Sequence, residues 1–125
     1  ASPQGLANSV WALASAGERD MVVLNRIVQV AGAKLQSFKP IDLAQLAWAF
    51  VTLEATDPKF FSAMAGHANM ELPAFRPVEL SSFAWALAKS GSSHEALFNG
   101  IAREAASRAR DFAPRELANV LWAFA

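Results

Sequence analysis

The fold of this chain is decided by the stretch PQGLANSVWALA at residues 3–14, which returns as PRELANVLWAFA at residues 114–125. The same pattern occurs twice more between these copies, always at intervals of 37 residues. Five kinds of position keep this interval: Trp11, Trp48, Trp85 and Trp122; Pro3, Pro40, Pro77 and Pro114; Leu6, Leu43, Leu80 and Leu117; Ala12, Ala49, Ala86 and Ala123; Phe38, Phe75 and Phe112. Agreement of five positions on one period predicts an internal repeat.

Each unit is predicted to form two helices joined by a short polar turn. The first helix begins at the proline, whose missing N–H would have no partner in the first turn of a helix anyway. It runs for about thirteen residues, to end near Gly17, Glu54 and Gly91. The second helix starts near Asp20, Asp57 and His94 and ends near residues 34, 71 and 108. Its apolar residues recur three and four positions apart, which places them on one face.

A single helical pair cannot bury its apolar face, whereas stacked pairs build a continuous core. We therefore expect an all-α fold, namely an α-solenoid of helix–turn–helix repeats with a 37-residue period. Residues 1–125 are expected to form one solenoid segment, with repeats at about 2–38, 39–75 and 76–112 and the first helix of a fourth at 113–125. Because that last unit has no second helix in this sequence, we expect Leu117, Leu121 and Trp122 to lack part of their cover. The chain is then either a piece of a longer array or one covered by partners.

Composition argues against several classes of function. Lys plus Arg and Asp plus Glu both number 11, so the net charge is zero and a strongly basic nucleic-acid domain is not expected, although a local basic patch is. The absence of cysteine excludes disulfides, thiolate zinc sites and thiol nucleophiles. We expect no signal peptide in residues 1–20 and no membrane insertion, because no apolar run is long enough. His67 and His94 have no second ligand at metal spacing, and no catalytic triad or phosphate loop is present. We expect no enzyme, cofactor or small-molecule substrate.

The first helices carry a polar strip once their core positions are set aside. Its members in successive units are Gln4, Asn8, Ala12 and Ser15; Ile41, Gln45, Ala49 and Thr52; Val78, Ser82, Ala86 and Lys89; Arg115, Asn119 and Ala123. If the units stack, one polar residue of each first helix would lie next to its equivalents on the concave surface. We call this row the polar ladder; it consists of Asn8, Gln45, Ser82 and Asn119. Such side chains can bind base edges, and the small alanine leaves room for a base. Alternatively, the amides bond neighbouring repeats and hold the stack together.

Basic residues precede or follow the prolines at similar places in the later units. Lys39, Arg76 and Arg115 are candidates for phosphate contacts, and helix N-termini also favour anions. Against this, an acid within one helical turn of each would repel a phosphate, namely Asp42, Glu79 and Glu116. Solvated surface charge is therefore the interpretation that we favour for these residues, and we favour it again for Arg103, Arg108 and Arg110. The tryptophans keep strict register with leucine and alanine, so we interpret them as packing residues rather than stacking platforms.

The motif Leu-Ala-Asn-x-x-Trp-Ala-x-Ala at residues 6–14 and 117–125, with Phe-x-Pro ahead of the later units, resembles the heptatricopeptide and octotricopeptide repeats. These are helical-repeat proteins of algal and protist organelles, related to arrays that often precede RAP domains. The period of 37 is closer to the heptatricopeptide class. In the middle units Gln45 and Ser82 stand where the family has Asn.

This resemblance implies binding of organellar RNA in a mitochondrion or chloroplast. The task would be transcript maturation, stabilisation or translation, or the holding of rRNA in a mitochondrial ribosome. The candidate contacts to single-stranded RNA or rRNA are Asn8, Gln45, Ser82, Asn119, Ser15, Thr52, Lys89, Lys39, Arg76 and Arg115. Zero net charge leaves a second hypothesis, a protein–protein scaffold or structural subunit of a large organellar complex. A positive concave face would favour RNA, whereas an apolar or acidic one would favour protein partners.

Overall fold

The computed structural model describes residues 2–91 and 94–123, which form helices and turns and contain no strand. The all-α prediction is thus confirmed for this part of the chain. The α-helices are α1 Pro3–Ala16, α2 Met21–Gly32, α3 Pro40–Thr52, α4 Pro58–Asn69, α5 Pro77–Lys89, α6 Glu95–Ser107 and α7 Pro114–Ala123. Short 3₁₀ helices precede α3, α5 and α7: η1 Leu35–Ser37, η2 Leu72–Ala74 and η3 Ala109–Asp111. Each odd-numbered helix begins at its predicted proline.

The helix starts are fixed by side chains that accept the free N–H groups of the first turn. Asp20 caps α2 and Asp57 caps α4, each accepting from two backbone N–H groups. The N-cap residues of α3 and α5 are Lys39 and Arg76, whose side chains have no acceptor atom. An acidic residue at the third helical position instead accepts a hydrogen bond from the backbone N–H group of the N-cap residue. The carboxylates concerned, and the backbone N–H groups they accept, are Asp42 from Lys39 at 3.1 Å, Glu79 from Arg76 at 2.9 Å and Glu116 from Ala113 at 2.7 Å.

The first helices of the units end in left-handed backbone at equivalent positions. Gly17 and Gly91 have φ of 70° and 79°, a conformation in which glycine carries no Cβ penalty. Glu54 lies midway between them in sequence and also has a positive φ, of 55°. The turn geometry is therefore kept in the second unit by a residue that carries a Cβ.

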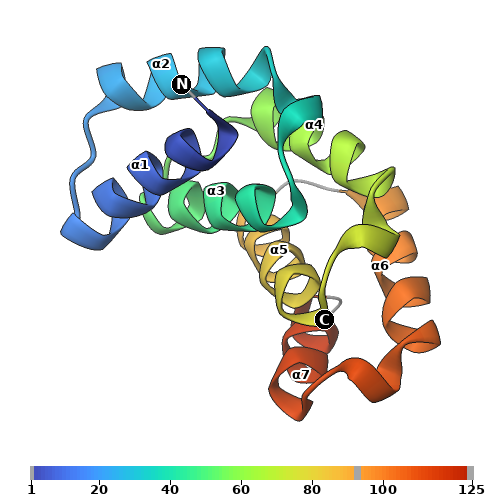
Figure 1. Cartoon of the computed structure of the whole chain (residues 1–125). Coiled ribbons are helices and arrows are strands. Elements are labelled where there is room, and N and C mark those ends of the chain that lie inside the picture. Colours follow the sequence, from blue (N-terminus) through green and yellow to red (C-terminus); the bar gives the residue numbers. More distant parts are fainter. Residues whose placement is uncertain (1, 92–93, 124–125) are drawn as a thin grey trace.

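The helices lie in two rows (Figure 1). α1, α3, α5 and α7 pack side by side in chain order along the inside of a bend, and α2, α4 and α6 lie along its outside. Neighbouring odd-numbered helices contact one another far more extensively than neighbouring even-numbered helices do. Small side chains buried in the odd-numbered row permit this close approach, among them Ala44, Ala47, Ala49, Ala84 and Ala86.

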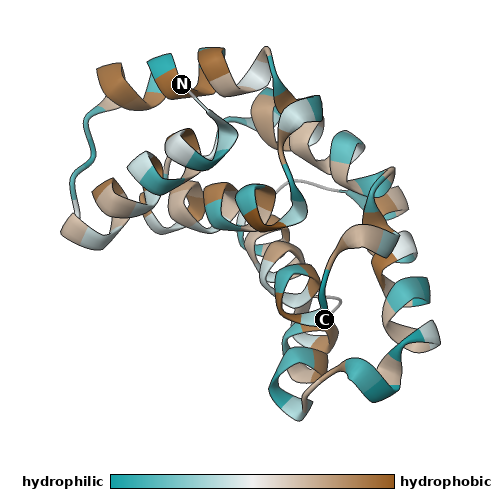
Figure 2. Ribbon diagram, viewed as in Figure 1, coloured by the Kyte–Doolittle hydropathy of each residue, from teal (hydrophilic) through white to brown (hydrophobic). Residues whose placement is uncertain are grey.

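The hydrophobic core lies between the two rows. Its fully buried members include Leu43, Leu46, Phe50, Phe61, Met64, Phe75, Leu80, Phe83, Leu87 and Ile101. The apolar residues that recur on one face of the second helices are buried, except that Phe98 is half-buried; they are Leu24, Ile27, Ala31, Phe61, Met64, Ala68, Phe98, Ile101 and Ala105. In α7, Leu117 is half-buried, and Leu121 is exposed whereas the equivalent Val10 and Ala47 are buried. Trp122 is exposed to the same extent as Trp11, so its exposure does not depend on the second helix of its unit. Figure 2 shows hydrophilic and hydrophobic residues interleaved along the helices, as amphipathic helices require. No helix in the described ranges is long and apolar enough to cross a membrane.

Candidate functional site

Three cavities follow one another along the exposed side of the odd-numbered helices. The α1–α3 cavity, of about 290 Å³, lies by the starts of those helices. The α3–α5 cavity has a volume of about 440 Å³ and the α5–α7 cavity a volume of about 600 Å³. We call this row the groove. Residues at equivalent positions of the sequence pattern line successive cavities, so the groove offers the same kinds of side chain repeatedly.

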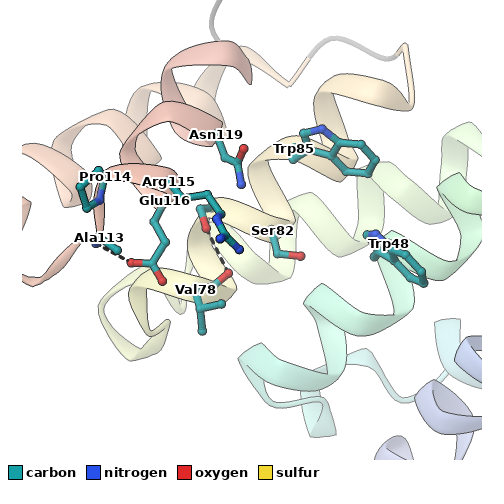
Figure 3. Close-up of a pocket in the computed structure, with 10 residues that line it drawn as sticks. Trp48, Val78, Ser82, Trp85, Ala113, Pro114, Arg115, Glu116 and Asn119 are labelled. Atoms are coloured by element: carbon teal, nitrogen blue, oxygen red, sulfur yellow. Dashed lines mark hydrogen bonds between the residues drawn. The ribbon is translucent and has the colours of Figure 1, made fainter.

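Three of the four residues of the predicted polar ladder line this groove, and Asn8 does not. Gln45 lines the α1–α3 and α3–α5 cavities, Ser82 the α3–α5 and α5–α7 cavities, and Asn119 the α5–α7 cavity. Asn8 is exposed on α1, and its Oδ1 accepts a hydrogen bond of 3.0 Å from Nε2 of Gln45. The structural interpretation of the amides therefore holds for this pair. Ser82 and Asn119 instead face the α5–α7 cavity (Figure 3), and no hydrogen bond joins them in the described part of the chain.

The alanines of the predicted strip lie elsewhere, and this part of the prediction is wrong for the two middle units. Ala49 and Ala86 are 0% exposed, because they face the tightly packed neighbouring helices. The residue one position earlier occupies the groove face instead, three residues after the ladder residue. The strip on the groove face thus reads Gln4, Asn8, Trp11 and Ser15; Ile41, Gln45, Trp48 and Thr52; Val78, Ser82, Trp85 and Lys89; Arg115, Asn119 and Trp122. Gln45, Trp48, Ser82, Trp85 and Asn119 are half-buried and the others are exposed.

The interpretation of the tryptophans as packing residues is correspondingly half right. Trp48 and Trp85 are half-buried and pack against the core, but both also line the α5–α7 cavity (Figure 3). Trp11 lines the α3–α5 cavity and is 47% exposed, as is Trp122. In each unit a tryptophan and an alanine are adjacent in sequence, so one large and one small side chain compete for the position that faces the neighbouring helix. The close spacing of the helices decides between them, because only the small one fits in the interface.

The remaining members of the strip differ in their surroundings. Ser15 and Thr52 are exposed near the ends of α1 and α3 and line none of the three cavities. Lys89 reaches back over two indoles, with its Nζ 5.7 Å from the ring centroid of Trp85 and 5.1 Å from that of Trp122. Such contacts between a cation and an aromatic face are attractive. Lys89 therefore covers the aromatic faces at the α7 end of the row.

The predicted basic residues line the groove, one to each cavity. Lys39 lies at the α1–α3 cavity, Arg76 at the α3–α5 cavity and Arg115 at the α5–α7 cavity. All three side chains belong to exposed residues. Arg76 also forms an ion pair in which its Nε lies 2.9 Å from Oε2 of Glu79, with side-chain exposures of 65% and 9%. One end of Arg76 is thus anchored while most of its surface stays in water.

The acids that line the groove have hydrogen-bond donors of their own at the helix starts. Asp42 and Glu79 are buried and accept N–H groups at the helix starts, and Glu116 is half-buried in the same arrangement. With their N-cap residues, the odd-numbered helices hold four cations and these three carboxylates. Each of the three cavities is lined by one of these cations and one of these acids, so the lining of the groove carries no net formal charge. The fourth cation, Lys89, is exposed and lines none of the cavities.

The basic stretch of the third unit lies on the other row of helices. Arg103 and Arg110 are exposed, and Nε of Arg108 lies 3.2 Å from Oε2 of Glu104. His94, at the start of α6, is buried, and loss of solvation lowers the pKa of its imidazole. Across the described residues no three of His, Cys, Asp or Glu gather closely enough to hold a metal ion.

The fold and the groove define an all-helical protein with a repeated aromatic and polar surface along one row of its helices. No family model matches the chain, and no curated protein matches it significantly.

Proposed function

We propose that this chain is a segment of an α-solenoid with a 37-residue repeat, which binds single-stranded RNA along its odd-numbered helices. The repeats are those inferred from the sequence, at about 2–38, 39–75, 76–112 and 113–125. The observation that carries the proposal is the groove. The α3–α5 and α5–α7 cavities each present two tryptophans and two ladder residues at equivalent positions, together with one arginine that stands at a different position of the repeat in each. A ligand that matches a repeated surface is itself repeated, and a single RNA strand has that property.

The chemistry of the groove matches the parts of a nucleotide. Hydroxyl and amide groups, such as those of Ser82 and Asn119, bind the edges of unpaired bases in repeat proteins that read RNA. Exposed cations along the groove attract the phosphates, and this attraction supplies much of the affinity of RNA-binding proteins. Each of these cations lies in a cavity that an acid also lines, so the attraction is modest. We therefore expect binding that is weak at high salt and that grows with the length of the strand.

Resemblance to the heptatricopeptide repeats supplies the cellular context of the proposal. It favours a mitochondrial or chloroplast protein acting on organellar transcripts, or one that holds rRNA in a mitochondrial ribosome. In the second case the chain would contact both RNA and protein, and the two hypotheses drawn from the sequence would describe one molecule.

Fluorescence anisotropy with a labelled pool of random single-stranded RNA tests the proposal. A first variant, Lys39→Gln with Arg115→Gln, removes two groove cations, and a matched control, Arg26→Gln with Lys59→Gln, removes two exposed cations from α2 and α4. Both variants change the net charge equally. We expect the groove variant to bind about tenfold more weakly in low salt, and the slope of log K against log salt to fall by about 1.4.

The control variant should retain most of the affinity, and duplex RNA of equal length should bind less well than the single strand. Equal losses in the two variants would show that the attraction is a property of overall charge, and the groove would then not be the site. Absence of binding at low salt in the unaltered chain would refute the RNA proposal.

A scaffold function is the second candidate, and one observation favours it. Ile41 and Val78 occupy groove positions where other units have Gln4 and Arg115, and they are 49% and 50% exposed. Exposed apolar side chains in a concave surface are typical of protein interfaces. A protein partner held by these residues would remain bound at high salt, whereas RNA would dissociate.

A further inference from the structure

We infer that the tryptophans of the groove are stacking platforms, so that the α3–α5 and α5–α7 cavities each take an unpaired base of the RNA strand. This deepens the proposed function and rests on it. It also reverses the role that the sequence pattern suggested for the tryptophans, for a reason that lies in the geometry of the groove.

The indoles are held rigidly and yet are open on the groove side. Trp48 and Trp85 pack against the core, which fixes their orientation. Trp48 lines both cavities, Trp11 joins it at the α3–α5 cavity and Trp85 joins it at the α5–α7 cavity. Figure 3 shows Trp48 and Trp85 on the same side of the α5–α7 cavity, with Ser82 nearby. A side chain buried on one side and open on the other is a preorganised partner for a planar ring.

Between the last two tryptophans of the groove face, the indole rings are covered by a lysine side chain. The rings of Trp85 and Trp122 have centroids 6.5 Å apart, and the ammonium group of Lys89 lies within 6 Å of both centroids. At the equivalent position the earlier units have Ser15 and Thr52, which are too short to reach back in this way. Within the described chain no comparable ring contact joins Trp11 to Trp48 or Trp48 to Trp85. The α3–α5 cavity lies at Trp11 and Trp48 and the α5–α7 cavity at Trp48 and Trp85. Lys89 instead covers the interval between Trp85 and Trp122.

Each open cavity also contains the other groups that a nucleotide needs. The ladder residue lies three positions before the tryptophan and on the same exposed face of its helix, so Ser82 stands beside Trp85 and Gln45 beside Trp48. A base stacked on the indole would present its edge to that side chain. Arg76 and Arg115 lie along the same two cavities, where the phosphates would pass. Cavities of about 440 and 600 Å³ are large enough to accept a base with part of its ribose.

A comparison of two oligomers of equal charge tests this inference on the unaltered protein. The first is oligouridylate and the second is an abasic ribose–phosphate oligomer of the same length. Replacing a stacking aromatic residue by alanine typically weakens the binding of a single strand by a factor of about 5 to more than 100 per base. We expect the abasic oligomer to bind at least about tenfold more weakly and to leave tryptophan fluorescence unquenched. Equal affinities would overturn the stacking inference while leaving the RNA proposal in place. Failure of both oligomers to bind would overturn both.

Matched variants then assign the effect to the groove. Trp48→Leu removes the indole shared by the two open cavities, whereas Trp122→Leu removes one that lines neither of them. We expect Trp48→Leu to lose about tenfold in affinity for oligouridylate and little for the abasic oligomer. Trp48→Phe should recover part of the loss, because it keeps an aromatic face. A similar loss for both oligomers in Trp48→Leu would indicate a structural role and overturn the inference.

Discussion

Replacement of two helical glycines by alanine should change the free energy of unfolding in opposite directions. Gly66 lies within α4 and Gly100 within α6, and the two helices pack against each other. In an exposed helix interior this replacement stabilises by about 0.8–1.0 kcal/mol, because alanine loses less backbone entropy on folding. A Cβ added at Gly66 would meet nothing within 4 Å. For Gly66→Ala we therefore expect a gain of about 1 kcal/mol.

At Gly100 the same methyl group meets its surroundings too closely. It would lie 2.7 Å from Cδ1 of Leu72 and 3.1 Å from Oδ1 of Asn69, where carbon atoms normally keep about 3.5–4.0 Å. Asn69 is exposed and can move, but Leu72 is 5% exposed and is held in the core. Overpacking of this kind costs about 1–3 kcal/mol. After the gain in helix propensity is subtracted, Gly100→Ala should be less stable than the unaltered chain by up to about 2 kcal/mol.

Urea denaturation followed by circular dichroism at 222 nm measures both effects. The midpoints of the two variants should lie on opposite sides of the original midpoint, with a difference in stability of about 2 kcal/mol. Adding Leu72→Ala to Gly100→Ala should cost less than adding Leu72→Ala to the original chain, because the clash has then been removed. If Gly100→Ala proved as stable as Gly66→Ala, the side chain of Leu72 would have moved aside at little cost, and the predicted overpacking would be refuted.

Two further predictions concern polar groups. A double-mutant cycle with Asn8→Ala and Gln45→Ala should give a coupling of about 0.5–1 kcal/mol, because the side chains share a hydrogen bond of 3.0 Å between α1 and α3; additive effects in urea denaturation would contradict that bond. Burial lowers the pKa of His94 in the folded state, so stability should decrease as the pH falls through the unfolded value of about 6.5 and level off below the lowered pKa. Thermal unfolding from pH 8 to pH 5 should show a smaller loss in His94→Gln, and an unchanged pH dependence would exclude His94 as its source.

The sequence was sufficient to predict the helices because their boundaries depend on local chemistry. Pro40 at a first helical position and Asp57 at an N-cap specify helix starts wherever they occur. Left-handed backbone at Gly17 ends α1 in the same local way. From the sequence, the acids after the prolines are expected to repel a phosphate. In the structure Asp42 replaces the missing cap of Lys39, because a lysine side chain offers no acceptor.

The face on which each residue lies was harder to predict, and Trp48 and Ala49 show why. A period identifies equivalent positions, but it does not state which of them point toward the neighbouring unit. Both residues recur with the same spacing, so the repeat pattern treats them alike. The choice is made by the distance between α3 and its neighbours, a tertiary property that favours alanine in the interface and leaves the indole in the groove.

The residues of the polar ladder differ in their hydrogen-bond partners, and we expect their roles in RNA binding to differ accordingly. Asn8 and Gln45 already satisfy one another, whereas Ser82 and Asn119 face a cavity. A base bound near α1 would have to replace the existing hydrogen bond, whose net contribution is about 0.5–1.5 kcal/mol. A base bound between α5 and α7 faces no such exchange. If RNA occupies the groove as proposed, its base preference should therefore be strongest in the α5–α7 cavity and weakest beside α1.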